Sequence, residues 1–275
     1  MASLRLGVRI FISISKKYMH SDKQTEYLRY DARAQSLLAE GSSIAEAAPD
    51  FGSLTALPIY RAPYNYYEQC IKRYISKDHD VLELGAGTGL HTYALVQTGA
   101  RVVASDISAH SLDVLSRRLN VERERVKTQV ADMEALPFGD NSFDVVTSAG
   151  SLSYGNPDMV DKEIKRVLRR GGILICVDSL NHNPIYRFNR LVHYLKGDRT
   201  KSTLFHMPTM ERIHSISKGF KSADVRYFGA VSYLMPILAR IIGQSHAACV
   251  SDAVDRLVNV REAAFKFVLV GNGRL

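Results

Sequence analysis

Short apolar runs alternate with amphipathic stretches through the middle of the chain. The first run, Val81–Leu84, has the length of one strand and is mostly apolar, as is typical of strands buried on both faces of a parallel sheet. Strand and helix patterns go on alternating as far as Val177. This order predicts an α/β fold whose parallel strands are joined by right-handed crossovers.

Helical patterns precede this core. Apolar residues recur at helical spacing across residues 18–41 and again from Pro63 to Ile75, where tyrosines form most of the stripe. Packing of these tyrosines against the sheet is the ordinary interpretation, and lining of a ligand pocket is the alternative. We therefore divide the chain into an N-terminal arm with a helical cap, residues 1–78, and a main domain, residues 79–275.

The last part of the main domain holds a long insertion and two late strands. The insertion covers residues 179–220, and Pro184 within it is well placed to begin a helix. We expect the insertion to act as a lid over a substrate. Further on, Ala264–Val270 has the pattern of a late strand, and Val225–Phe228 is suited to be its partner.

Alternate glycines follow the first predicted strand, at Gly85, Gly87 and Gly89. Glycine allows a positive φ and a close approach of the backbone to a ligand, and the amides of the next helix then face that ligand. A dinucleotide site requires a third glycine where this chain has Leu90. The spacing found instead, with the acid Glu83 two residues before the first glycine, resembles motif I of the class I S-adenosylmethionine-dependent methyltransferases, in their small-molecule "type 11" branch.

Further resemblance to this family follows in the family's own order. Arg101–Asp106 resembles the second strand with its terminal acid, and Gln129–Phe138 resembles the third strand and the loop beneath the adenine. Phe143–Ser148 is similar to the fourth strand. Ile164–Leu174 is similar to the helix, glycine turn and fifth strand, with Arg170 in place of the usual proline. The resemblance implies a seven-stranded, mostly parallel, doubly wound sheet with a helical insertion after the fifth of its strands.

The resemblance also implies the cofactor, S-adenosyl-L-methionine, with S-adenosyl-L-homocysteine as product. Asp106 lies about twenty residues beyond the glycines, a spacing suited to a carboxylate on ribose hydroxyls. The family's pattern transfers onto these positions: Glu83 near the methionine amino group, Gly85, Ala86, Gly87 and Gly89 along the backbone cradle, Asp106 on the ribose, Ile107 and Met133 against the adenine, Asp132 on the adenine amino group, and Ser148 and Ala149 near the sulfonium. For Ile107 and Met133 an ordinary core role is the alternative.

The implied chemistry is in-line methyl transfer from a sulfonium, in which orientation supplies much of the catalysis. A sugar hydroxyl is a poor nucleophile and would also need a general base. Residues at the carboxyl ends of parallel strands face the crevice of an open sheet. We therefore consider His182 as a base, Tyr154 as an orienting hydroxyl and His206 as a candidate from the insertion. For each, a capping, packing or solvent-facing role is the structural alternative.

Charge is concentrated in the C-terminal third. Residues 179–275 carry 14 basic and 6 acidic side chains, whereas residues 81–178 carry 11 and 13. A basic lid beside an active site would favour an anionic small-molecule substrate. A solvated basic face without any partner is the alternative.

The remaining composition narrows the class of protein. Cys70, Cys176 and Cys249 are odd in number and widely spaced, which favours a reducing compartment, and we expect a cytoplasmic protein. Since no apolar run reaches eighteen residues, no membrane span is predicted.

No histidine and carboxylate cluster has metal-ligand spacing, so we predict no metal. Residues 1–20 are basic and only loosely like a transit peptide. A homodimer is compatible with the sequence.

The methyl acceptor is the least determined part. Nucleic-acid methyltransferases of this fold often carry an Asn or Asp, two prolines and an aromatic residue after the fourth strand, where this chain has Ser148–Ser151. That argues against nucleic acid as substrate. Asn181–Leu204 looks similar to methyltransferases among surface-polysaccharide enzymes, so O-methylation of a sugar or glycan intermediate is our first expectation.

Other functions stay open at this point. N- or C-methylation of another small molecule is the alternative within the enzyme class. A non-catalytic, methyltransferase-like binding subunit is the alternative outside it, although the intact glycines, Glu83 and Asp106 argue against that. An RNA methyltransferase drawn to phosphate by the basic C-terminal third would show salt-sensitive RNA binding.

Overall fold

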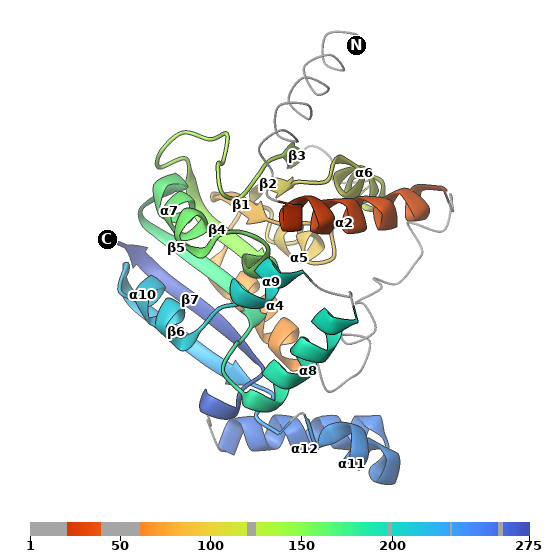
Figure 1. Cartoon of the computed structure of the whole chain (residues 1–275). Coiled ribbons are helices and arrows are strands. Elements are labelled where there is room, and N and C mark those ends of the chain that lie inside the picture. Colours follow the sequence, from red (N-terminus) through yellow and green to blue (C-terminus); the bar gives the residue numbers. More distant parts are fainter. Residues whose placement is uncertain (1–20, 40–60, 120–124, 197–199, 232, 258–260) are drawn as a thin grey trace.

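Seven strands form one sheet at the centre of the molecule (Figure 1). The computed structural model describes residues 21–39, 61–119, 125–196, 200–231, 233–257 and 261–275. The strands in chain order are β1 (Asp80–Leu84), β2 (Arg101–Asp106), β3 (Val126–Val130), β4 (Phe143–Ala149), β5 (Leu168–Ser179), β6 (Phe220–Phe228) and β7 (Lys266–Arg274). Across the sheet they run in the order β3-β2-β1-β4-β5-β7-β6.

The pairing of the strands confirms the predicted doubly wound sheet. β3, β2, β1, β4 and β5 are all parallel to their neighbours. β7 is antiparallel to both β5 and β6 and lies between them. The late strand is therefore inserted beside the sixth, as the resemblance implied.

Helices cover both faces of the sheet and its carboxyl edge (Figure 1). In chain order the described helices are α2 (Ser21–Ala39), α4 (Ala62–Tyr74), α5 (Thr92–Val96), α6 (Ala109–Arg118), the 3₁₀ turn η3 (Leu152–Tyr154), α7 (Pro157–Val167), α8 (Pro184–Leu195), α9 (Lys201–Phe205), α10 (Met210–Ser217), α11 (Met235–Ile242), α12 (Gln244–Leu257) and the 3₁₀ turn η4 (Arg261–Ala263).

Alternation along β1 shows how the two faces of the sheet are built. Leu82 and Leu84 are fully buried in the cluster that includes residues of α7 and α10. Val81 points to the opposite face, where it packs in a second cluster with Tyr67 and Ile71 of α4. Successive side chains of a strand point to opposite faces, so mostly apolar strands are what a sheet covered on both sides requires.

The C-terminal third contains more helix than the sequence patterns predicted. The insertion after β5 holds α8, α9 and α10, as expected for a helical lid. The helical pair α11 and α12, which lies between β6 and β7, was not predicted. It lies at the lower end of the molecule in Figure 1, next to the ends of β6 and β7.

Helix α2 is tied both to the strand side and to the insertion. Its Asp31 accepts a hydrogen bond from Ser108 Oγ (2.8 Å) at the start of α6. Its Glu26 accepts bonds from the hydroxyls of Thr200 (2.9 Å) and Thr203 (3.1 Å) beside α9. Both carboxyl groups are buried, and buried carboxylates are normally held by such donors. α2 therefore bridges the cofactor half of the sheet and the insertion.

Candidate functional site

A cavity lies where β1, β2 and β4 end at the carboxyl edge of the sheet. We call it the carboxyl-edge cavity. Its lining comes from α2 and from the loops after these strands and β3: Lys23, Glu26, Tyr27, Tyr30, Gly85, Gly87, Ser105, Asp106, Ile107, Ser111, Ala131, Asp132, Met133, Ala149, Gly150, Ser151 and Tyr154. Open α/β sheets bind ligands in the crevice at this edge, at the point where the strand order reverses.

Two glycines after β1 give the cavity its backbone wall. Gly85 has a φ of +63°, and a Cβ placed there would lie 2.4 Å from the Cβ of Ser151. Gly87 has a φ of +54°, but nothing lies within 4 Å of where its Cβ would be. The first glycine is thus required by protein packing. The second borders open space that a ligand can fill.

Asp106 joins the glycine turn to the end of β2. Its Oδ2 accepts a hydrogen bond from the backbone N–H of Gly87 (2.9 Å), and its Oδ1 accepts one from Ser108 N–H (2.9 Å). Burial raises the pKa of this carboxyl above its usual value, while the amide donors of Ser108, Gly87 and Ile107 oppose the rise. The carboxylate is therefore held in place at the predicted ribose position.

Asp132 and Met133 border the same cavity after β3, with a partner for Asp132 that the sequence did not indicate. Lys23 Nζ of α2 lies 2.5 Å from Asp132 Oδ2 and 2.9 Å from Glu134. The other oxygen of Asp132 accepts the N–H of Glu134 (3.0 Å). An adenine amino group at Asp132 would have to share the carboxylate with Lys23 or displace the lysine.

The α2 face of the cavity was missed as a set of site residues. Lys23, Glu26, Tyr27 and Tyr30 follow the i, i+3, i+4, i+7 spacing of one helix face. That spacing was the signal, but a periodic stripe alone does not say what the helix covers. The hydroxyl oxygens of Tyr30 and Tyr154 lie 2.5 Å apart, so α2 meets the loop after β4 across the cavity.

Some residues predicted to bind the cofactor do not line the carboxyl-edge cavity. Gly89 instead makes room for α6, because a Cβ there would lie 2.8 Å from Leu115 Cγ. Ser148 is fully buried, and its hydroxyl oxygen lies 2.7 Å from that of Ser151. The N–H of Ala86 donates to Ser105 O (2.9 Å) and holds the turn against β2. These residues support the cavity wall rather than form it.

Glu83 also lies outside the cavity lining. Strand alternation turns its side chain to the face that carries Tyr67, where Thr92 Oγ1 donates to it (2.6 Å). The residue is buried. Burial, together with the charge of nearby Asp106, raises the pKa of Glu83 to about 7 against the opposing hydrogen bond from Thr92. The carboxyl thus titrates within the physiological range beneath the glycine turn.

Of the candidate catalytic residues, Tyr154 lines the carboxyl-edge cavity and the two histidines do not. His182 is exposed, just before α8. His206 ends α9, and its carbonyl oxygen accepts a hydrogen bond from Arg212 Nη1 (3.3 Å). The segments that carry them meet, because Arg212 donates to the carbonyl oxygens of both Leu152 and His206, and Asn181 N–H donates to Pro208 O (2.8 Å).

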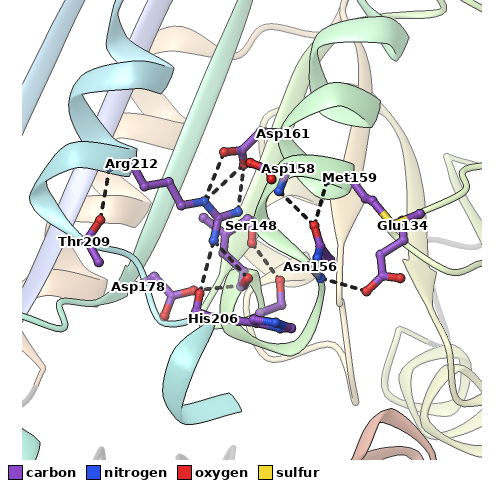
Figure 2. A network of polar contacts seen from close by, with 12 residues as sticks. Glu134, Ser148, Asn156, Asp158, Met159, Asp161, Asp178, His206, Thr209 and Arg212 are labelled. Carbon is purple, nitrogen blue, oxygen red and sulfur yellow. Dashed lines mark hydrogen bonds and ion pairs between the residues drawn. The ribbon is translucent and has the colours of Figure 1, made fainter. Parts of the chain in front are cut away.

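A buried arginine organises the loop after β4 (Figure 2). Arg212 of α10 pairs with Asp161 of α7 (2.7 Å) and donates to the carbonyl oxygen of Leu152 (3.3 Å). Asp178 at the end of β5 accepts the N–H of Leu152 (2.9 Å). The η3 turn is thus held from both sides. This network fixes the segment that supplies Gly150, Ser151 and Tyr154 to the cavity.

The described ranges contain neither a cluster of metal ligands nor a helix suited to cross a membrane. Within them no group of three or more His, Cys, Asp and Glu side chains is arranged to hold a metal ion. Among the same residues no helix has both the length and the apolar character to cross a bilayer.

Comparisons with known proteins match this geometry. Residues 82–176 match the family model described as a methyltransferase domain. The chain is 42% identical over 113 residues to the demethylmenaquinone methyltransferase of Clavibacter sepedonicus, covering 39% of this chain and 44% of that protein. It is 35% identical over 135 residues to methyltransferase GfsG of Streptomyces halstedii, covering 47% and 48%. The chain thus spans about half the length of the curated relatives it matches.

Solved structures share the fold at low sequence identity. Phosphoethanolamine N-methyltransferase 2 of Haemonchus contortus, in complex with S-adenosyl-L-methionine, aligns with a TM-score of 0.55 and 18% identity over 85% of this chain and 60% of that chain. Geranyl diphosphate C-methyltransferase of Streptomyces coelicolor A3(2) aligns with a TM-score of 0.53 and 16% identity over 77% and 81%.

The sheet order, the glycine turn and the acid at the end of β2 define a class I methyltransferase fold. Residues 82–176 match a methyltransferase domain, and the curated relatives that this part of the chain resembles are methyltransferases.

Replacement of Gly87 by alanine separates backbone strain from ligand exclusion. We expect Gly87→Ala to lower the free energy of unfolding by about 1–2 kcal/mol through its positive φ. Gly171→Ala is the matched control, because Gly171 also has a positive φ (+79°) and open space at its Cβ position but lies outside the cavity lining. Only Gly87→Ala should weaken binding of S-adenosylhomocysteine, measured by calorimetry. Equal affinities in both variants would contradict the assignment of the open space to a ligand.

Titration of Glu83 should make stability depend on pH. The folded-state pKa of about 7 lies above the ordinary 4.5, so the folded chain holds a proton that the unfolded chain has released between these values. The contribution is full below pH 4.5, is lost as the pH rises to about 7, and is then constant. Its slope approaches about 1.4 kcal/mol per pH unit.

Glu83→Gln removes this titration and keeps a partner for Thr92. The free energy of unfolding of both proteins is measured with urea between pH 4.5 and 8. The difference between the two proteins should change up to about pH 7 and stay constant above it. Parallel curves would mean that Glu83 is ionised in the folded protein throughout this range.

Proposed function

We propose that this protein binds S-adenosyl-L-methionine in the carboxyl-edge cavity and catalyses methyl transfer to a small-molecule acceptor. The observation that carries the proposal is the arrangement at the end of β2, where a buried carboxylate and the open space at Gly87 border one cavity. In the proposed complex Asp106 binds the ribose hydroxyls, Ile107 and Met133 contact the adenine, and Asp132 accepts its amino group.

In this proposal the residues of the chain orient the cofactor and the acceptor and form no covalent bond with either. The cofactor, when bound, supplies an electrophilic methyl group on a sulfonium. Ala149 and Gly150 at the end of β4 border the place where that group would lie, and Tyr154 is suited to orient an acceptor. Holding the acceptor atom in line with the methyl carbon is the main source of rate enhancement.

The acceptor stays a prediction. O-methylation of a sugar or glycan intermediate is supported by the resemblance of Asn181–Leu204, and the insertion 179–220 is proposed as the lid that selects the acceptor. The names of the relatives, which include demethylmenaquinone and phosphoethanolamine methyltransferases, support the broader class of small molecules. N- or C-methylation therefore stays the alternative. A cytoplasmic location and a homodimer are likewise predictions.

An anionic acceptor is supported by a buried lysine at the carboxyl edge. Lys266, the first residue of β7, is 7% exposed, and its ammonium group donates to Ser179 Oγ (3.3 Å). It also lies over the ring of Tyr64, 5.0 Å from the centroid. Among the described residues no carboxylate is paired with it at salt-bridge distance, although burial raises the pKa of the nearby Asp178 and the charge of Lys266 opposes this rise. A buried ammonium has three donors to satisfy, so an acceptor oxygen is a suitable additional partner.

Tyr64 connects this lysine to the carboxyl-edge cavity. The ring of Tyr64 stacks on His91 (5.1 Å between centroids). Its hydroxyl oxygen is 3.8 Å from where a Cβ of Gly150 would lie, and Gly150 lines the cavity. We therefore place the acceptor between the end of β4 and the Tyr64–Lys266 pair.

The cofactor proposal is tested by calorimetric titration with S-adenosylmethionine and S-adenosylhomocysteine. We expect Asp106→Asn to weaken both by about 10- to 100-fold, since hydrogen bonds to a charged group are worth about 1.5–3 kcal/mol. Asp113→Asn, at an exposed acid of α6, is the control and should bind as the wild type does.

Two results would contradict the cofactor proposal. Absence of binding to the intact protein would favour the non-catalytic binding subunit, and unchanged affinity of a folded Asp106→Asn variant would place the ribose elsewhere. RNA binding at physiological salt would revive the RNA alternative, because phosphate contacts dominate such binding.

The acceptor proposal is tested at Lys266. With an anionic acceptor found by screening phosphorylated small molecules and nucleotide sugars, Lys266→Met should raise KM for the acceptor about tenfold or more, while binding of S-adenosylhomocysteine stays unchanged. Lys218→Met, at an exposed lysine, should change neither quantity. A Lys266→Met variant with the wild-type KM would show that the ammonium does not contact the acceptor.

A further inference from the structure

Helices α8 and α11 present bulky apolar side chains to solvent. On α8, Phe188 is 68% and Leu195 is 73% exposed, and on α11, Ile237 is 64% and Ile241 is 76% exposed. Scattered exposed apolar residues are normal, but a concentration of them on neighbouring helices marks an interaction surface. α11 has no role in the proposed methyl transfer, and α8 belongs to the insertion proposed as the lid.

These residues form continuous stripes at helical spacing. On α8 the exposed positions Ile185, Phe188, Leu191 and Leu195 follow i, i+3, i+6, i+10, which is one face of a helix. The opposite side of α8 carries the buried Tyr186. Each exposed stripe is therefore the outer side of a helix that is already anchored to the protein.

α11 has the same construction. Leu234, Ile237 and Ile241 are exposed at i, i+3, i+7, whereas Met235 is buried in a small cluster with Ala247 of α12. The two stripes together define what we call the apolar face: Ile185, Phe188, Leu191, Leu195, Leu234, Ile237 and Ile241.

The helices that carry the apolar face lie at the same end of the molecule (Figure 1). Tyr186 of α8 links them, because its hydroxyl donates to Gly229 O (3.4 Å) after β6 and its ring lies 6.5 Å from that of Tyr233, just before α11. α8 is thus joined to the segment that leads from β6 into α11.

The charges on these helices have one sign. Arg187 and Arg240 are exposed on α8 and α11, and Lys196 is exposed directly after α8. Neither α8 nor α11 contains an aspartate or glutamate. A helix with a bulky apolar face, basic neighbours and no acid is the composition that binds an anionic lipid surface in the interface plane.

We propose that the apolar face docks the protein on the surface of an anionic lipid bilayer. α8 and α11 would lie on the membrane with their apolar stripes between the headgroups, and Arg187, Lys196 and Arg240 would meet lipid phosphates. A two-fold dimer through the same face is disfavoured, because both sides of the interface would carry exposed cations and neither α8 nor α11 supplies an acid. The proposal does not depend on the methyl-transfer proposal.

The test is sedimentation of the full chain with lipid vesicles in 0.15 M salt. We expect binding to vesicles that contain phosphatidylglycerol and little binding to pure phosphatidylcholine, with a loss at 0.5 M salt. Ile237→Ser/Ile241→Ser should weaken binding by about tenfold or more, and Arg240→Gln by about fivefold. Tyr93→Ser, which changes a 56% exposed aromatic residue on α5, is the matched control and should bind normally.

The outcomes separate a membrane from other partners. Wild-type binding by the Ile237→Ser/Ile241→Ser variant, or an equal loss in Tyr93→Ser, would overturn the proposal. So would absence of vesicle binding together with a dimer, seen by light scattering, that the double substitution dissociates. Retained binding of S-adenosylhomocysteine by each variant would show that the cavity is intact, so failure of docking and failure of the cofactor proposal are distinguishable.

Discussion

The site depends on one buried carboxylate, that of Asp106. It accepts the amide of Gly87 with one oxygen and the amide of Ser108 with the other. The ends of β1 and β2 are thereby fixed to each other and to the start of α6. Without this carboxylate, two backbone donors at the turn would lose their partner, and buried unpaired donors are costly. The same group is therefore structural for the turn and is oriented toward the carboxyl-edge cavity.

The cavity is closed by elements distant in the sequence, and these are mutually connected. Lys23 of α2 forms an ion pair with Asp132, and Glu26 of the same helix accepts hydrogen bonds from Thr200 and Thr203. α2 therefore joins the loop after β3, where the adenine is proposed to bind, to the insertion. Arg212 holds the loop after β4 from the other side. A ligand that displaces Lys23 would thus act on a helix that also contacts α6 and the insertion.

The sequence predicted β1, β2 and β4 well because each is a short, mostly apolar run with a clear end. β3 and β6 are more polar, and the predicted segments overlap them only in part. Arg101–Asp106 was bounded correctly, and the antiparallel late strand followed from the family resemblance. Glu83 and Gly89 do not line the carboxyl-edge cavity, and their contacts with the cofactor stay predictions. Strand alternation turns Glu83 into the α4 face, and Gly89 serves the packing of Leu115. The α2 lining and the pair α11 and α12 depend on tertiary contacts that no local pattern expresses.

The most direct test of the account is a crystal structure of the protein with S-adenosylhomocysteine. We expect the ribose hydroxyls to contact Asp106 and the adenine to lie between Ile107 and Met133. We also expect Lys23 either to leave Asp132 or to share it with the adenine. A nucleoside bound outside the carboxyl-edge cavity, or bound inside it without contact to Asp106, would contradict the central claim.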